Sequence, residues 1–310
     1  MSSIAQKLDA VLTLGRISNL PTVWTNCLAA FLLNRIGQYS PIFTLPDTVR
    51  EGFWGPEDAS LLGWIILGAS LIYVAGTTLN DAFDVEFDRK HNPERPIPSG
   101  VMKTWEVWFV GFAELIGGAA ILFYYAKVSP VYLVLLCLTI LAYDAVHKKW
   151  SGSLWLMGAC RLFLWWTVAS ASLDAGEKLS NLVYVWSITL LLYIAGITFV
   201  AKGEATGKLP KIPWPFFLLF APVLMGLFFC LYENHLAGLP VLLALYWGVR
   251  KGVLHAQKKG PSIGKGVGLW LALITVGDAL AIALVLPVWG YLCLLAFPLC
   301  LWTQKRFAAT

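Results

Sequence analysis

Acidic side chains gather at the end of one apolar stretch of the sequence, in segment 77–89. Asn80, Asp84 and Asp88 follow one another at intervals of four, so on a helix they lie on one face with about 6 Å of rise between neighbours. Asp81 is one position away from this line. Acids at the C-terminal end of a helix oppose the helix dipole and repel one another, which favours a bound cation over a plain acidic helix end. Mg²⁺ takes one or two carboxylates together with substrate phosphate oxygens, so the segment indicates a site for Mg²⁺ and a phosphate or diphosphate.

A proline-rich connector follows the acidic segment. Residues 91–100 contain three prolines and a glycine, which predict an irregular backbone. Arg95 is presented on this connector, and a guanidinium group suits phosphate oxygens. Arg95 is therefore a candidate substrate ligand; the alternative is an ordinary solvated arginine.

The pattern Asn80-Asp81-x-x-Asp84-x-x-x-Asp88, followed by Arg95-Pro-Ile-Pro-Ser-Gly100, resembles the first signature of the UbiA superfamily of intramembrane prenyltransferases. The resemblance implies about nine transmembrane helices and transfer of a prenyl group from a prenyl diphosphate to an acceptor, with release of diphosphate. It also implies Mg²⁺ as the cofactor. The connector is more similar to the branches that act on glycerol phosphates or chlorophyllides than to the 4-hydroxybenzoate branch, and it also resembles UbiA-like proteins of bacterial Ebo gene clusters.

The end of another apolar stretch, 130–146, resembles the Tyr and Lys element of the same family. Tyr143 and Lys148 lie there, and the resemblance implies that Lys148 contacts diphosphate. The alternative is that Lys148 anchors the helix at the membrane edge. Asp144 departs from the small residue usual at its position, and it could orient Lys148 or act as a base toward the acceptor.

Arg161 lies inside the apolar stretch 153–172. A guanidinium at membrane depth is costly and usually faces the interior of a helix bundle. Its candidate acidic partners are Glu114, Asp144 and Asp278. Arg161 is therefore either half of a structural ion pair or a ligand of a donor phosphate or an anionic acceptor. Arg16 and Asn26, which flank the first apolar stretch, are candidates for the acceptor pocket.

The segment 71–78 is repeated at 191–198, with five of eight residues identical at an offset of 120. This predicts two related halves that each send a helix end to a shared site, unless the match is chance similarity between apolar stretches. In this register Asp84 aligns with Glu204, while Asn80 and Asp81 align with apolar residues. The second acidic motif that the family resemblance implies is therefore degenerate, and Lys202 could take over the charge of one Mg²⁺.

The candidate residues form three groups. Asp84, Asp88 and Lys148 are the catalytic candidates; Asn80, Asp84 and Asp88 are the metal ligands; Asn80, Asp81, Arg95, Tyr143, Arg161, Lys202 and Glu204 bind substrate.

The elements that must position these residues are apolar helices. Of the 310 residues, 58% are hydrophobic and 13% are charged, whereas soluble domains carry about 25% charge, which excludes an ordinary soluble enzyme. About 20 apolar residues span a bilayer, and such stretches lie near 17–35, 60–81, 105–125, 130–146, 153–172, 183–201, 213–232, 236–249 and 267–286. The shorter stretch 288–303 is a candidate tenth span. The sequence thus predicts one all-α transmembrane domain over residues 1–310.

Basic residues are distributed unevenly between the two sides of this predicted bundle. With the N-terminus inside, and the C-terminal tail also inside as a tenth span requires, 18 of the 23 Lys and Arg residues lie on the inner side and four lie outside. The positive-inside rule therefore places the acidic segment at the cytoplasmic face. The same rule explains the net charge of +5 without a nucleic-acid partner.

Two other kinds of protein remain as alternatives. A transporter also carries intramembrane charge and repeated halves, but its site is expected near the bilayer midplane. A family member that binds prenyl diphosphate without turnover would fit the degenerate second motif. An aromatic compound, a glycerol phosphate, and a sugar or cyclitol are all open as acceptors.

Overall fold

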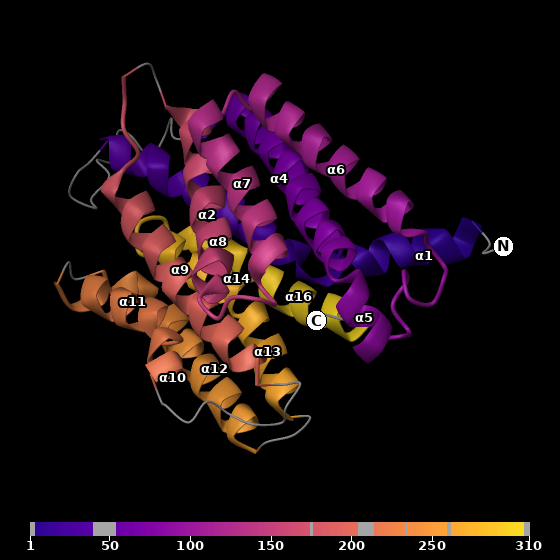
Figure 1. The fold of residues 1–310 in the computed structure, drawn as a ribbon. Coiled ribbons are helices and arrows are strands. Elements are labelled where there is room, and N and C mark those ends of the chain that lie inside the picture. The colour runs from indigo at the N-terminus through magenta and orange to yellow at the C-terminus, as the bar shows by residue number, and fades with distance from the viewer. Residues whose placement is uncertain are drawn as a thin grey trace.

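A computed structural model describes residues 4–39, 54–173, 176–203, 214–232, 235–258 and 262–306. Every regular element in these ranges is a helix, and the long helices pack side by side in one bundle (Figure 1). The all-helical class predicted from the sequence is confirmed.

The N-terminal elements are α1 (Ile4–Leu14), η1 (Ile17–Asn19), α2 (Leu20–Tyr39), α4 (Pro56–Phe83), α5 (Val85–His91), α6 (Thr104–Tyr124), α7 (Pro130–Val146), α8 (Ser153–Ala169) and η2 (Ser170–Ser172). The C-terminal elements are α9 (Asn181–Ala201), α10 (Trp214–Leu218), α11 (Ala221–Tyr232), η3 (Leu236–Gly238), α12 (Leu239–Gln257), α13 (Ser262–Ala272), α14 (Ile274–Ala283), α15 (Pro287–Cys293) and α16 (Ala296–Arg306).

Seven helical stretches of the described chain are long and apolar enough to cross a membrane, which makes the protein an integral membrane protein. They are Pro56–Phe83, Thr104–Tyr124, Ser153–Ser172, Asn181–Ala201, Leu236–Gln257, Ser262–Ala283 and Pro287–Arg306. The helices α7 and α11 are apolar but shorter, with 17 and 12 residues. The candidate tenth span belongs to the seven, whereas α2, over the predicted span 17–35, does not. The total of nine or ten spans stays a prediction.

The acidic segment bends at Asp84, which corrects the prediction of one continuous helical face. α4 ends at Phe83 and α5 begins at Val85; between them Asp84 has a ψ of 2°, far from the value of about −42° in a regular helix. The backbone hydrogen bonds continue through the bend, from the Asp84 amide to the Asn80 carbonyl (3.0 Å) and from the Asp88 amide to the Asp84 carbonyl (2.9 Å). Asp88 therefore lies on a different helix axis from Asn80.

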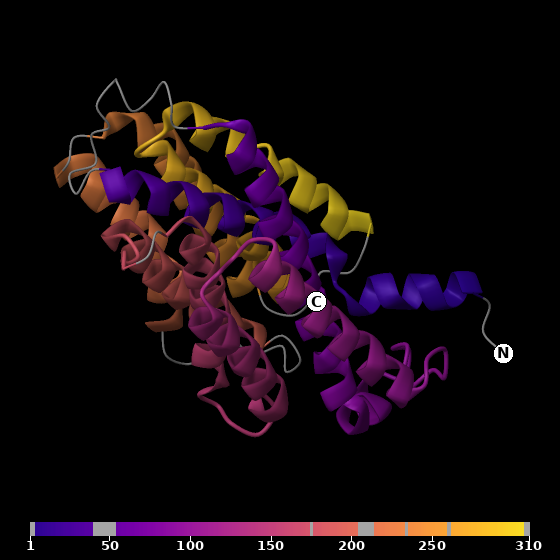
Figure 2. The ribbon, with the colours of Figure 1, turned by 90° about the horizontal axis from the view of Figure 1, so that it is seen from above.

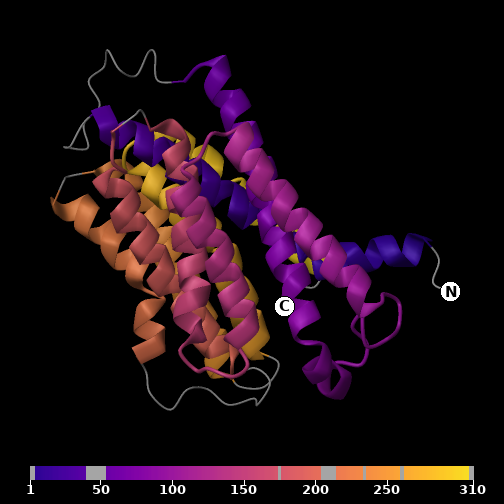
Figure 3. The same ribbon diagram turned by 45° about the horizontal axis from the view of Figure 1, so that its top comes forward.

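Small residues bring α4 and α6 into close contact along the flank of the bundle (Figure 3). A Cβ atom added at Gly118 would lie 2.7 Å from the Gly68 carbonyl oxygen, and one added at Gly68 would lie 2.7 Å from the Leu122 side chain. Helices in membranes associate through such close backbone approach, because lipid supplies no hydrophobic driving force between them. This seam holds the helix that carries Asn80 in place.

The first helix, α1, projects sideways from the end of the bundle where the acidic segment lies (Figure 2). Its inner residues Ala10 and Leu14 belong to a small apolar cluster with residues of α4, α6 and the connector. The other buried members are Ala82, Ile97, Met102 and Val107. Lys7 also forms an ion pair with Glu106 at 2.7 Å. α1 and α6 thus hold the connector that carries Arg95.

Candidate active site

A cavity of about 500 Å³ opens among α4, α7, α8, α9 and α13. Its charged lining side chains are Arg16, Asp84, Arg95, Asp144, His147, Lys148, Arg161 and Lys202. Asp84 contacts both His147 and Lys148, and we call this part of the cavity its charged end. The remaining wall is mostly apolar, and its members include Ala69, Ile72, Leu136, Ile140, Leu164, Ile194, Ile197, Val267 and Leu271. The cavity therefore suits a molecule with a charged head and an apolar body.

Asp84 lies at the charged end, where α4 gives way to α5. Its Oδ2 atom is 3.1 Å from His147 Nε2 and 3.3 Å from Lys148 Nζ. Burial opposes the negative charge of Asp84, but the hydrogen bond and charge of His147 and the charge of Lys148 outweigh it and lower the pKa of the carboxyl below its ordinary value. Lys148 also lies 4.1 Å from the centre of the Phe87 ring. Asp84 is thus held as a carboxylate beside two basic groups.

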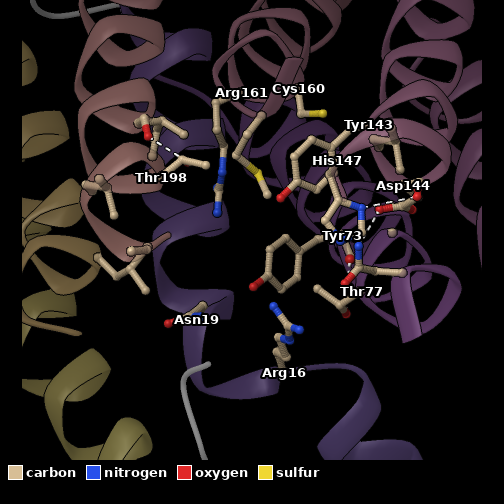
Figure 4. A pocket seen from close by; sticks show the side chains of 18 of the residues that line it. Arg16, Asn19, Tyr73, Thr77, Tyr143, Asp144, His147, Cys160, Arg161 and Thr198 are labelled. Atoms are coloured by element: carbon tan, nitrogen blue, oxygen red, sulfur yellow. Dashed lines mark hydrogen bonds between the residues drawn. The ribbon is translucent and has the colours of Figure 1, made fainter. Parts of the chain in front are cut away.

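Asn80 and Asp144 join α4 to α7 at the same corner. Asn80 Nδ2 donates a hydrogen bond to Asp144 Oδ1 at 2.9 Å. Asp144 Oδ2 is buried and has no hydrogen-bond partner among the described residues. Figure 4 shows Asp144 and His147 together on one side of the cavity, next to Tyr143. The Tyr143 ring stacks on the His147 imidazole with 5.0 Å between ring centres.

Arg95 is engaged by two carboxylates that the sequence assigned to other roles. Its Nη1 atom lies 2.8 Å from Asp88 Oδ2 and 3.2 Å from Asp81 Oδ1. Asn92 donates a hydrogen bond to the other oxygen of Asp88 at 2.8 Å, and Arg16 lies 3.7 Å from Asp81. Burial disfavours the charge of Arg95, but the two carboxylates outweigh it and raise the pKa of the guanidinium above its ordinary value.

The predicted acidic cluster is therefore divided by the bend at Asp84. Asn80 and Asp84 line the cavity, whereas Asp81 and Asp88 do not. Asp88 is only 1% exposed, and both of its carboxylate oxygens have partners in the protein. Asp88 is thus placed to hold Arg95 and the connector rather than to face the cavity.

Arg161 enters the cavity from α8, across from Asp144 (Figure 4). Its guanidinium donates to Asn26 Oδ1 (2.9 Å) and Thr22 Oγ1 (3.1 Å) and lies 5.3 Å from the centre of the Tyr73 ring. Asn26 in turn donates to Asp278 Oδ2 at 2.7 Å. Asp278, one of the three candidate acids, is therefore connected to Arg161 through Asn26.

Lys202 also lines the cavity, just beyond the end of α9. Its Nζ atom donates to the Ser151 carbonyl (3.1 Å) and to Ser153 Oγ (3.3 Å), and partial burial lowers its pKa. The ends of α4 and α9 thus meet at one cavity, as the repeated segment predicts. Glu204 lies outside the described residues.

Three contributors to the site were not among the candidates from the sequence. His147, Thr22 and Tyr73 line the cavity or hold residues that line it. Only His147 carried a usable signal, since it lies between Asp144 and Lys148 at the end of one helix. Threonine and tyrosine within apolar stretches have many structural roles, so the residue types of Thr22 and Tyr73 alone did not identify them as parts of the site.

The donors at this corner fit Mg²⁺. In the described part of the chain, no three His, Cys, Asp or Glu side chains are grouped so as to hold a metal ion by themselves. Mg²⁺ does not need such a group, because it usually binds one or two carboxylates and completes its shell with water and substrate phosphates. Asn80 and Asp84 provide oxygen atoms at the cavity. Asp144 adds a third source, because it contacts Asn80 through Oδ1 while its Oδ2 atom has no hydrogen-bond partner among the described residues. These are the hard oxygen donors that Mg²⁺ prefers.

Known proteins resemble this chain in sequence and in fold. The 2-acylphloroglucinol 4-prenyltransferase of Humulus lupulus is 28% identical over 152 residues, which is 48% of this chain and 36% of that protein. The digeranylgeranylglyceryl phosphate synthase of Methanosarcina mazei is 33% identical over 104 residues, which is 32% of this chain and 35% of that protein. The matched region thus spans about a third of the length of these relatives.

Two solved structures have the same fold. One comes from work on digeranylgeranylglyceryl phosphate synthase in membranes; its TM-score is 0.57 at 18% identity, over 90% of this chain and 99% of that chain. The other is the apo structure of a UbiA homolog from Aeropyrum pernix K1, with a TM-score of 0.58 at 16% identity, over 86% of this chain and 97% of that chain. The profile of the UbiA prenyltransferase family matches residues 53–310. The chain therefore belongs to the UbiA prenyltransferase family.

Proposed function

We propose that this protein transfers a prenyl group from a prenyl diphosphate to an acceptor at the cytoplasmic face of the membrane, with Mg²⁺ as cofactor and release of diphosphate. The observation that carries the proposal is the division of one cavity into a charged end and an apolar wall. A prenyl diphosphate has the same division between its head and its chain.

The basic side chains at the charged end bind the diphosphate. Lys148 and Lys202 line the cavity from just beyond the ends of α7 and α9, and Arg95 reaches it from the connector. Asp81 and Asp88 hold the Arg95 guanidinium in place through their ion pairs. Positive charge that is positioned in advance stabilises a leaving group whose negative charge grows in the transition state.

Asn80 and Asp84 hold the Mg²⁺ ion in this proposal, which would neutralise part of the diphosphate charge. In the reaction the allylic C–O bond breaks, and its electron pair leaves with the diphosphate. A nucleophilic atom of the acceptor forms the new bond to the prenyl carbon and loses a proton. The apolar wall accommodates the chain, and it excludes water that would otherwise capture the allyl cation.

The cytoplasmic position of the site is supported by the distribution of basic residues. Arg16, Arg95, Lys148 and Lys202 all line the cavity, and each belongs to the basic side of the predicted topology. The proposal covers an aromatic compound, a glycerol phosphate, and a sugar or cyclitol as acceptors. Tyr143 and Arg161 also line the cavity, and in this proposal they bind substrate there.

The test is prenyl transfer by the purified full-length protein in nanodiscs. Prenyl diphosphates of increasing length are offered with Mg²⁺ and one acceptor of each class, and diphosphate release and product mass are measured. We expect Asp84→Asn to lower turnover at least about a hundredfold, near 3 kcal/mol of transition-state stabilisation. Glu86→Gln is the matched control, because Glu86 is an exposed acid two residues away.

Two outcomes would contradict the proposal. Unchanged turnover in Asp84→Asn would show that the reaction takes place elsewhere in the protein. Tight binding of prenyl diphosphate with no turnover for any acceptor class would identify a non-catalytic member of the family.

A further inference from the structure

Asp144 is a buried carboxylate with one unused oxygen at the charged end of the cavity. The residue is 5% exposed and lines the cavity. Oδ1 accepts the hydrogen bond from Asn80, whereas Oδ2 has no hydrogen-bond partner among the described residues. A buried polar atom without a hydrogen-bond partner is unfavourable, and such an atom in a native structure often marks the place of an ion, a water or a ligand.

The hydrogen bond between Asn80 and Asp144 also fixes the direction of the Asn80 amide. Because the Nδ2 atom donates to Asp144, the Oδ1 atom of the same amide remains available as an acceptor. Asn80 and Asp84 lie one helical turn apart at the end of α4. Side-chain oxygen atoms from two helices, α4 and α7, therefore lie together at one corner of the cavity.

His147 and Lys148 leave part of Asp84 free for a further contact. Both basic groups approach the Oδ2 atom of Asp84, at 3.1 and 3.3 Å. The imidazole is oriented by a second contact, since its Nδ1 atom lies 3.2 Å from the Asp144 carbonyl oxygen. Lys202, just beyond the end of α9, adds a cation to the lining, and Asp84 and Asp144 are its two acids among the described residues.

We propose that Asp144 is a metal ligand, and that it binds one Mg²⁺ ion together with Asn80 and Asp84. The donor set of two carboxylates and one amide oxygen matches the preference of Mg²⁺, and water or diphosphate oxygens complete the shell. The inference rests on the proposed function for the identity of the metal. It differs from the assignment based on the acidic segment alone, because Asp144 takes the place of Asp88.

The experiment measures Mn²⁺ binding by electron paramagnetic resonance, with Mn²⁺ as a stand-in for Mg²⁺. The full-length protein is titrated in detergent micelles, first without substrate and then with inorganic diphosphate. We expect one Mn²⁺ ion per chain in the wild type. Asp144→Asn keeps an acceptor for Asn80 but loses the charge, and it should weaken Mn²⁺ binding at least about tenfold. The control variant is Glu86→Gln, which removes an exposed acid two residues from Asp84, and it should bind Mn²⁺ as tightly as the wild type does.

A second variant separates a ligand from a residue that only supports the fold. Asp144→Cys replaces a hard oxygen by a soft sulfur, so the ratio of Cd²⁺ to Mn²⁺ affinity should rise at least about tenfold. Thermal melting of each variant is recorded, and binding is measured below the lowest melting temperature. If Asp144→Asn is too unstable to titrate, the change in metal preference of Asp144→Cys decides the question.

The inference and the proposed function fail in different ways. Unchanged Mn²⁺ affinity in Asp144→Asn, or no change of metal preference in Asp144→Cys, would overturn the inference. If Mn²⁺ affinity is unchanged while prenyl transfer falls, Asp144 acts on the acceptor, and the inference is overturned while the function stands. A wild-type protein that binds Mn²⁺ through Asp144 but transfers no prenyl group would overturn the function alone.

Discussion

The substitution Asp88→Asn separates metal binding from the support of the connector. Asp88 is buried beneath Arg95, at 2.8 Å, with side-chain exposures of 2% for Asp88 and 28% for Arg95. At this distance and an effective dielectric constant of about 20, the attraction between the charges is about 6 kcal/mol. Desolvation of the two groups offsets much of this attraction. Because Arg95 keeps its contact with Asp81, we expect a net loss of about 2–3 kcal/mol in the free energy of unfolding, below the range for a fully broken buried pair.

The assay compares Asp88→Asn with Asp84→Asn in two measurements on the same preparations. Denaturant titration in mixed micelles gives the free energy of unfolding, and paramagnetic resonance gives the Mn²⁺ affinity without substrate. We expect Asp88→Asn to lower stability and leave Mn²⁺ affinity within about twofold, whereas Asp84→Asn should weaken Mn²⁺ binding at least about tenfold. Turnover should fall in both, because Arg95 loses one of its two carboxylate partners in the first variant and the metal is lost in the second.

Either of two results would refute this reasoning. If Asp88→Asn weakens Mn²⁺ binding as much as Asp84→Asn does, Asp88 is a metal ligand, and the bend at Asp84 does not separate the two acids in function. If neither the free energy of unfolding nor the Mn²⁺ affinity changes in Asp88→Asn, the ion pair between Asp88 and Arg95 does not stabilise the protein.

Three further predictions concern the seam between helices, the buried network and pH. Gly118→Ala should destabilise the protein by about 1–3 kcal/mol through overpacking against α4, whereas Gly117→Ala, whose Cβ atom would meet nothing within 4 Å, should not; denaturant titration of both variants checks this. Asp278→Asn should cost about 1–3 kcal/mol, because Asp278 anchors Arg161 through Asn26, and an unchanged unfolding midpoint would contradict the contact. The pKa of Asp84 is lowered on folding, so its stabilisation is full above the unfolded pKa of about 3.9 and is lost only as pH falls through the lower folded pKa. Denaturant titration checks this: a loss of stability between about pH 5 and 4 that is absent from Asp84→Asn would contradict it, because Asp84 should stay ionised there.

Much of the site could be predicted from the sequence because its chemistry is concentrated in short segments. The interval of four between Asn80 and Asp84 placed both on one helical face, and the structure keeps both at the cavity. Lys148, Arg161 and Lys202 also line the cavity. Each of these residues stood out because a charged group within or beside an apolar helix is costly unless it has a function or a partner.

The same local reasoning failed where the helix axis changes. The interval between Asp84 and Asp88 equals that between Asn80 and Asp84, yet the backbone bend at Asp84 turns Asp88 toward Arg95. No residue in this segment is a proline or glycine, so the sequence offers no ordinary signal of a helix break.

The sequence by itself determined that the protein is a helical membrane protein, and it singled out several of the charged residues that line the cavity. These properties depend on composition and on spacing along one helix, where neighbours are fixed by 3.6 residues per turn. Only the tertiary structure decided the partners of those charges. Asn80 contacts Asp144 across 64 residues, and Asn26 contacts Asp278 across 252. Such contacts depend on which helices pack together and at what rotation, and helical periodicity within one segment carries no information about either.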